Sequence, residues 1–188
     1  MQHSSQISMK TSANPKIQQK INRSIIFNYL RLKGPSYRAE ISRHLRISAP
    51  AVSRAIERLK IEGFVEEKDK ILTKTGKRAF LVQLNLNYGA IIAIDLLMEH
   101  MKIASYDLEG KMINKKTGRR YAESENIVQD LIKDIQSFFE DPKSLQVNGS
   151  DVKPILISIG VPAAVNPSTG EITGCYLYPS LKGLNLKE

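Results

Sequence analysis

Residues 36–67, SYRAEISRHLRISAPAVSRAIERLKIEGFVEE, contain two helix-length segments separated by the short turn RIS. In the first segment, Ile41 and Leu45 lie four residues apart and therefore share one face of a helix. We expect this helix over residues 37–45, with Ser36 as its N-cap, because a serine hydroxyl can accept a hydrogen bond from a free backbone N–H.

The second segment begins at Ser48, a favourable N-cap residue, and has Pro50 in its first turn, where the missing N–H needs no partner. Its predicted inward face consists of apolar residues at helical spacing: Val52, Ile56 and Leu59. Gly63 ends the helix, because glycine readily adopts the conformation that terminates helices. Two short helices joined by a tight turn are typical of a helix-turn-helix.

The second helix of a helix-turn-helix enters the DNA major groove by its N-terminal end. The residues that we predict to contact DNA from this helix are Ser48, Ala49, Pro50, Ser53, Arg54 and Arg58. The Arg54 guanidinium can donate two hydrogen bonds to a guanine edge, and the Ser53 hydroxyl can reach a base or a phosphate. Alternatively, Arg54 and Arg58 form only the solvated face of a helical hairpin.

The flanking segments predict further elements of the same unit. Residues 16–33 predict an amphipathic helix that Gly34 and Pro35 end, with an apolar stripe at steps of three and four: Ile17, Ile21, Ile25, Tyr29 and Leu32. After the second helix, residues 64–65 and 80–82 predict two short strands, which make the unit a winged helix. The stretch TKTGKRA at the end of the loop between them has three cationic residues, Lys74, Lys77 and Arg78, which we predict to follow a phosphate backbone or enter a narrow A·T-rich minor groove.

The charge of the chain is concentrated in this region. The 188 residues have a formal net charge of +9, but residues 1–88 have 17 Lys and Arg against 6 Asp and Glu, whereas residues 89–188 have 11 against 13. A basic half indicates nucleic acid or an anionic membrane as a partner, although a charged surface for solubility would show the same excess.

Other classes of protein are disfavoured. The polar residues 1–15 have no apolar core of a signal peptide and predict a disordered tail, and no apolar run reaches the roughly 20 residues that span a bilayer. The single cysteine, Cys175, allows no internal disulfide, and the three histidines show no metal-ligand spacing with it. We therefore expect a cytoplasmic protein with no metal site and no cofactor.

The near-neutral half predicts a mixed α/β lobe. Its predicted elements are strands over residues 90–95 and 101–106, a turn at Gly110, a third strand over 111–120, a helix over 125–140 with Ile127, Leu131, Ile135 and Phe138 inward, and a strand over 154–162. The last strand is almost wholly apolar, and such runs are typical of strands buried on both faces.

Taken together, these segments resemble the ROK family, which comprises repressors, open reading frames and kinases. The matching stretches are INRSIIFNYLRLKGPSYRAEI, SAPAVSRAIERLKIEGFVEE, TGKRAFLVQLN, GAIIAIDLLMEHMKIASYDLEGKMI and ISIGVPAAVNPSTGEI, in the family's order. The resemblance implies an α+β winged helix-turn-helix over residues 16–84. It implies that residues 85–188 begin a sugar-kinase-like α/β lobe of the actin, hexokinase and ribonuclease H type, incomplete at this length.

The chain departs from the family pattern in three places. The family's regulators usually have Gly-Arg-Pro where residues 76–79 are GKRA, and often a glycine in the turn, where here Arg46 or Ile47 must adopt its conformation. Family kinases have Asp-x-Gly-Gly-Thr at the first hairpin, where residues 95–100 are DLLMEH. Without those glycines the loop should bind ATP poorly, so Asp95 is expected to be structural, and the family's catalytic aspartate lies beyond these residues.

The stretch GVPAAVNPSTG resembles the family loop beside the sugar pocket, which implies Gly160, Pro162 and Asn166 as ligand-binding residues. A turn closing a strand is an equally good interpretation. The resemblance implies a transcriptional regulator, expected to be a repressor, of carbohydrate genes, without enzymatic activity. The expected partners are a palindromic duplex operator with A·T-rich flanks, a sugar or sugar-phosphate effector, and further copies of the chain in a homodimer or higher oligomer. The alternatives are a sugar kinase with an added DNA-binding arm, and a DNA-binding module without a ligand.

Overall fold

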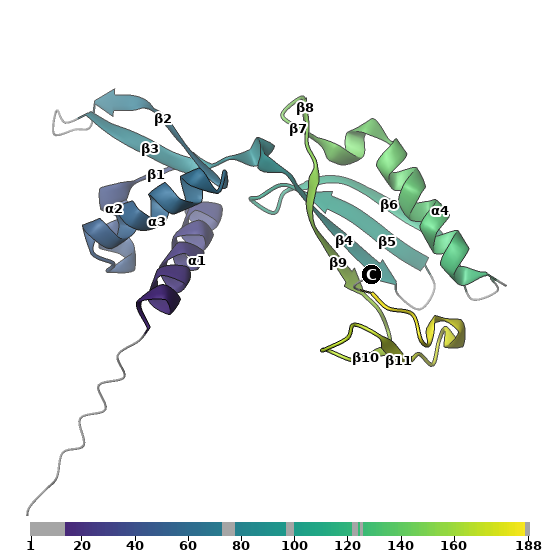
Figure 1. Cartoon of the computed structure of the whole chain (residues 1–188). Coiled ribbons are helices and arrows are strands. Elements are labelled where there is room, and N and C mark those ends of the chain that lie inside the picture. The colour runs from purple at the N-terminus through teal and green to yellow at the C-terminus, as the bar shows by residue number, and fades with distance from the viewer. Residues whose placement is uncertain (1–13, 73–77, 97–99, 122–123, 125, 187–188) are drawn as a thin grey trace, which may run out of the picture. The chain divides into compact units, whose positions relative to one another are not determined.

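The computed structural model describes residues 14–72, 78–96, 100–121, 124 and 126–186. The chain forms two compact units that divide between Leu84 and Asn85 (Figure 1). Among the described residues, none of the helices is long and apolar enough to cross a membrane.

The first unit contains three helices and a small antiparallel sheet. The helices are α1 (Pro15–Lys33), α2 (Arg38–Leu45) and α3 (Ala49–Ile61). The strands are β1 (Ser36–Tyr37), β2 (Val65–Leu72) and β3 (Arg78–Leu84), in the order β1-β3-β2. The strands β2 and β3 pair directly, as the two predicted strands do, and both are longer than the sequence pattern indicated.

Helix α1 begins within the predicted N-terminal tail. The Asn14 side-chain oxygen accepts a hydrogen bond from the Lys16 backbone N–H at 3.0 Å, and Pro15 occupies the first helical position. The apolar stripe noted in the sequence is not the buried face of α1, since four of its members are exposed: Ile17, Ile21, Ile25 and Leu32. The buried residues are Ile26 and Leu30, because these lie on the face that packs against α3.

Helices α2 and α3 follow the predicted pattern with one correction at the first cap. Ser36 lies in β1, and its hydroxyl donates to the Gly34 carbonyl at 3.1 Å, so it does not cap α2. The cap residue is Tyr37, whose backbone N–H donates to Glu40 at 3.1 Å. A backbone donor and a glutamate three residues later thus replace the serine hydroxyl.

The turn between the two helices adopts the expected left-handed conformation. Arg46 has φ 54° and ψ 36°, which confirms that a non-glycine residue takes this role. The Ser42 hydroxyl donates to the Ile47 carbonyl at 2.7 Å and holds the turn. Ser48 is the N-cap of α3 by position, but its side chain makes no capping hydrogen bond there. The inward face of α3 is confirmed, since its predicted residues are all buried: Val52, Ile56 and Leu59.

The second unit is a four-stranded sheet with one long helix against it (Figure 1). The strands are β4 (Ala90–Leu96), β5 (His100–Tyr106), β6 (Met112–Arg120) and β9 (Pro154–Gly160), in the order β6-β5-β4-β9, and the helix is α4 (Ile127–Glu140). The smaller strands are β7 (Gln146–Val147), β8 (Ser150–Asp151), β10 (Ala164–Val165) and β11 (Ile172–Gly174). Short 3-10 helices span Leu86–Tyr88, Pro142–Leu145 and Pro179–Leu181.

Helix α4 covers the antiparallel part of the sheet. Ile127 and Phe138 are buried in the core, and Leu131 and Ile135 pack against it, so the predicted inward face is confirmed. Tyr121, just after β6, donates through its hydroxyl to the buried carboxylate of Asp134 on α4 at 2.5 Å. This contact ties the helix to the sheet.

Strand β9 does not have the burial that its sequence predicts. All seven of its residues are exposed, including Leu156 at 56% and Ile157 at 51%. The strand pairs in parallel with β4 at the edge of the sheet, whereas α4 packs over β5 and β6. The prediction of a fully buried strand is therefore wrong for the described part of the chain, because an edge strand needs cover from another segment on both faces.

Candidate nucleic-acid interface

The N-terminal half of α3 presents an exposed surface. Ser48, Ala49 and Pro50 are exposed at the start of the helix, and Ser53 is half-buried. Arg54, one helical turn after Pro50, is exposed. The structure thus places five of the predicted DNA-contact residues together on one helix end, because the apolar residues of α3 face the opposite way into the core.

The carboxylate of Glu57, on this same helix, is neutralised by the neighbouring helix. The Arg38 guanidinium, at the start of α2, donates to Glu57 at 2.5 Å and to Glu67 on β2 at 2.6 Å. Lys60 donates to the other Glu67 oxygen at 2.6 Å. A free carboxylate on α3 would repel a phosphate backbone, and the ion pair with Arg38 reduces that repulsion.

The same network fixes the angle between α2 and α3. Burial opposes ionisation of Glu67, but the hydrogen bonds from Lys60 and Arg38 outweigh it, so the pKa of Glu67 lies below its usual value. Burial likewise lowers the pKa of Arg38, yet the hydrogen bonds that its guanidinium donates to Glu57 and Glu67 raise it above its ordinary value overall. Arg38 and Glu67 therefore remain charged at neutral pH.

Arg58 lies further along α3 and has an acidic partner. Glu62 accepts from Arg58 at 2.8 Å and from Arg23 of α1 at 3.0 Å. Because Arg58 is paired with Glu62, it is less free than Arg54 to bind an external anion. Arg54 forms no ion pair with any of the residues that the structure describes.

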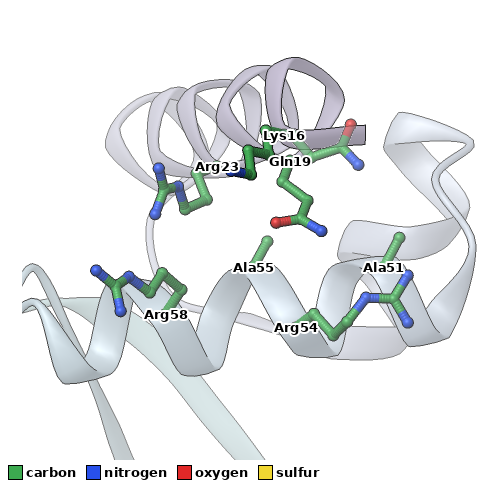
Figure 2. A pocket seen from close by; sticks show the side chains of 8 residues that line it. Lys16, Gln19, Arg23, Ala51, Arg54, Ala55 and Arg58 are labelled. Atoms are coloured by element: carbon green, nitrogen blue, oxygen red, sulfur yellow. The ribbon is translucent and has the colours of Figure 1, made fainter. Parts of the chain in front are cut away.

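A groove of about 510 Å³ separates the N-terminal half of α1 from α3 (Figure 2). Its lining residues are Lys16, Gln19, Asn22 and Arg23 from α1 and Ala51, Arg54, Ala55 and Arg58 from α3. In Figure 2 the Gln19 side chain points from α1 towards α3, while Arg54 extends along α3 beneath it. Residues of α1 therefore lie beside the exposed basic surface of α3, across this groove.

The α1 residues of this groove were missed by the sequence analysis, although a signal was present. Lys16, Gln19 and Arg23 precede Ile26 and Leu30 at steps of three and four, so they share the face that packs against α3. A second apolar stripe, formed by Ile17, Ile21 and Ile25, hides this pattern in the sequence.

The side chains of the three residues predicted to contact DNA from the wing are outside the described part of the structure. Lys74 and Lys77 lie outside the described residues. Only the backbone of Arg78 is described, and it opens β3 opposite Leu72. Their contribution to DNA binding stays a prediction.

Comparisons with known proteins identify the family. No protein-family model matches the sequence. The chain is 30% identical over 155 residues to the xylose repressor of Caldicellulosiruptor bescii, and 31% identical over 148 residues to a putative xylose repressor of Caldicellulosiruptor sp. strain Rt8B.4. The matches cover 79% and 77% of this chain but 36% and 35% of those relatives, so the chain spans about a third of their length.

A solved structure of similar fold is that of a ROK family transcriptional regulator, a homologue of the E. coli MLC protein. Its TM-score is 0.61 at 19% identity, and the match covers 89% of this chain and 41% of that one. The chain belongs to the ROK family.

The predicted sugar loop of this ROK chain is organised as a turn. Asn166 accepts hydrogen bonds through its side-chain oxygen from the backbone N–H groups of Ser168 at 2.9 Å and Thr169 at 3.3 Å. The Pro162 carbonyl accepts from the Cys175 thiol at 3.5 Å. These contacts favour the structural interpretation of Asn166 and Pro162, because the Asn166 side-chain oxygen and the Pro162 carbonyl already have partners.

Gly160 has a different position in the ROK chain. It ends β9 beside Asp95 at the end of β4, and a Cβ placed on it would lie 3.2 Å from an Asp95 carboxylate oxygen. The carboxyl ends of adjacent parallel strands are a common place for ligands. The ligand role of Gly160 therefore stays a prediction with a geometric basis.

The hairpin that a ROK kinase would use for phosphate is only partly described. Residues 97–99 lie outside the described residues, but Leu96 is buried in the core of the second unit. Asp95 is exposed and lies opposite Lys102 across the hairpin. Among the residues that the structure describes, no group of three or more metal-ligating side chains occurs.

Proposed function

We propose that this chain is the DNA-binding part of a sugar-responsive ROK repressor that acts in the cytoplasm. In this proposal residues 16–84 form a winged helix-turn-helix, with α2 and α3 as its two helices and β2 and β3 as its wing. Residues 85–188 begin an actin- or hexokinase-like lobe of the ribonuclease H type, which senses the sugar and contributes to dimerisation.

The observation that carries this proposal is the exposed N-terminal half of α3 with its free Arg54. The helix lies after a tight left-handed turn, its carboxylate Glu57 is paired with Arg38, and residues 1–88 have a net charge of +11. Such a helix end can enter a major groove, and an arginine there can donate to guanine O6 and N7.

The proposed mechanism is a change in the spacing of two such helices. A homodimer would place two α3 helices in successive major grooves, about 34–36 Å apart. A sugar that binds one arrangement of the lobes more tightly would alter this spacing and so the affinity for a palindromic operator. Lys74, Lys77 and Arg78 in the proposed wing would contact A·T-rich flanks.

The proposed repressor has no kinase activity. Close approach of backbone N–H groups to a phosphate requires small residues, whereas Leu96 is buried in the core and is followed by Leu97 and Met98 in sequence. Magnesium-ATP with a panel of hexoses and N-acetylhexosamines should therefore give no release of ADP above background. Turnover that Asp95→Ala abolishes would contradict this part of the proposal.

The test of DNA binding starts from selection of bound duplexes out of a random pool. The selected duplex should bind the chain with an affinity that falls steeply with salt, because each phosphate contact adds roughly 0.9 to the slope of log K against log salt. A flat salt response, or no enrichment of any duplex, would contradict the proposal. D-xylose is the first effector to test with a chain extended to the relatives' full length, because two relatives are named xylose repressors.

A further inference from the structure

The face of α1 that packs on α3 changes its chemistry along the helix. In the C-terminal half this face consists of Ile26 and Leu30, both buried. Towards the N-terminus the same face continues as Arg23, Gln19 and Lys16. A helix face that seals a core is normally apolar throughout, so the basic half calls for a different explanation.

The facing part of α3 leaves room instead of filling it. Ala51 and Ala55 are small, and the resulting groove holds about 510 Å³ (Figure 2). Protein interiors are close-packed, and a helix pair of this kind usually closes such a gap with leucine or isoleucine. Here the gap is bordered by cationic side chains and by the amides of Gln19 and Asn22.

The positive charge of the groove is neutralised at one end only. Glu62 accepts from Arg23 and Arg58, which lie together at one end of the groove in Figure 2. Lys16 and Arg54, which line the other part, form no ion pair with a described residue. Like charges that border one groove repel each other, and a bound anion would convert this repulsion into attraction.

We infer that this α1–α3 groove binds a phosphate of the DNA backbone through Lys16 and Gln19, beside the base-reading Arg54. The inference rests on the proposed DNA-binding function and adds α1 to the contact surface. The N-terminal half of α3 is the part that enters a major groove, and the α1–α3 groove opens beside this half. The Lys16 ammonium and the Gln19 amide both line this groove, and both can donate to the oxygens of a backbone phosphate.

The sharpest test is Gln19→Glu, which keeps the side-chain shape and places a carboxylate in the groove. The affinity for every duplex should fall by at least about tenfold, because a carboxylate facing a phosphate is repelled at close range. Gln136→Glu is the matched control, since it adds the same charge at an exposed residue of α4 that does not line the groove. The control should lose less than about threefold, because its carboxylate stays in solvent.

A salt titration then counts the phosphate contact. Lys16→Ala should lower the slope of log K against log salt by roughly 0.9, equally for all sequences. Lys33→Ala removes the same charge at the other end of α1, about 25 Å away along the helix, and should leave the slope unchanged. Circular dichroism melting of all four variants checks that α1 remains folded.

The outcomes separate the groove from the function. If the wild-type chain binds duplex DNA and both Gln19→Glu and Lys16→Ala bind like their controls, the groove assignment is wrong while the proposed function stands. If the wild-type chain binds no duplex, the proposed function itself fails. Titration with orthophosphate, followed by NMR of the Gln19 amide, distinguishes the source: binding that does not compete with duplex DNA would make the groove a free-anion site and overturn the inference.

Discussion

Helix α3 and strand β9 are both rich in isoleucine and leucine, yet they end in opposite environments. Ile56 of α3 is fully buried, whereas Ile157 of β9 is 51% exposed. The helix needs cover on one stripe only, and α1, α2 and the small sheet, all close in sequence, supply it. A strand has two faces and two edges, and β9 has one described neighbour, β4. Apolar content therefore predicts burial more reliably for the helix than for the strand.

The largest expected effect comes from the covered side of this comparison. Ile56→Ala should lower the free energy of unfolding of the first unit by about 2–5 kcal/mol, because it removes buried methyl groups and leaves a cavity. Amide hydrogen exchange in α3 measures this unit separately from the second. Ile61→Ala, in the same helix but with Ile61 76% exposed, is the control, and an equal loss in both variants would contradict the packing described for α3.

In the second unit, helix α4 is held against the sheet by the ion pair of Asp134 with Arg119 as well as by apolar contacts. Burial opposes ionisation of Asp134, but hydrogen bonds from Tyr121 and Arg119 outweigh it, so the pKa of Asp134 lies below its usual value. A depressed pKa contributes stability that is present above the unfolded-state pKa and is lost as the pH falls through the folded-state value.

Asp134→Asn should therefore lower the stability of the second unit by about 1–3 kcal/mol at pH 7, and this difference should shrink below about pH 4. Urea unfolding across this pH range, followed by a probe in α4, measures the effect. Asp151→Asn, at an exposed position of β8, should change neither the stability nor its pH dependence. A constant difference at every pH would mean that the carboxylate charge contributes nothing.

A third prediction concerns binding at the exposed end of α3. Arg54→Ala should weaken binding to the selected duplex by about 1–3 kcal/mol and relax the preference at one base pair per half-site. Arg43→Ala, an exposed arginine of α2 outside the groove, should have a smaller and sequence-independent effect. Arg78→Ala should weaken binding mainly where the minor groove is narrow. Equal losses for all three variants on all sequences would remove the base-reading role of Arg54.

The smallest effect is expected on the uncovered side. Ile157→Ala should change the free energy of unfolding of the second unit by less than about 1 kcal/mol, because a half-exposed side chain buries little surface. Urea unfolding of the 188-residue chain, followed in the second unit, is the measurement. A loss as large as that of Ile56→Ala would show that β9 is covered in solution.

Several features could be predicted because they depend on neighbours in sequence. The start of α3 after Ser48 and its inward residues follow from local spacing. The family resemblance left the left-handed residue of the turn open between Arg46 and Ile47, and the structure places it at Arg46. The predicted N-cap of α2 was wrong by one residue. The Tyr37 backbone N–H donates to Glu40 at the start of the helix, whereas the Ser36 hydroxyl donates to the Gly34 carbonyl. Local patterns thus locate an element well and its terminal hydrogen bonds less well.

By itself, the sequence determined the order of helices and strands, the basic character of the first half and the exposed residues at the start of α3, since these depend on composition and on contacts a few residues apart. Only the tertiary structure decided which stripe of α1 faces α3, how Glu57 is neutralised by Arg38, and that β9 lies at a sheet edge. The reason is that α1 has two apolar stripes, and the choice between them depends on the shape of α3, a surface formed by residues far along the chain.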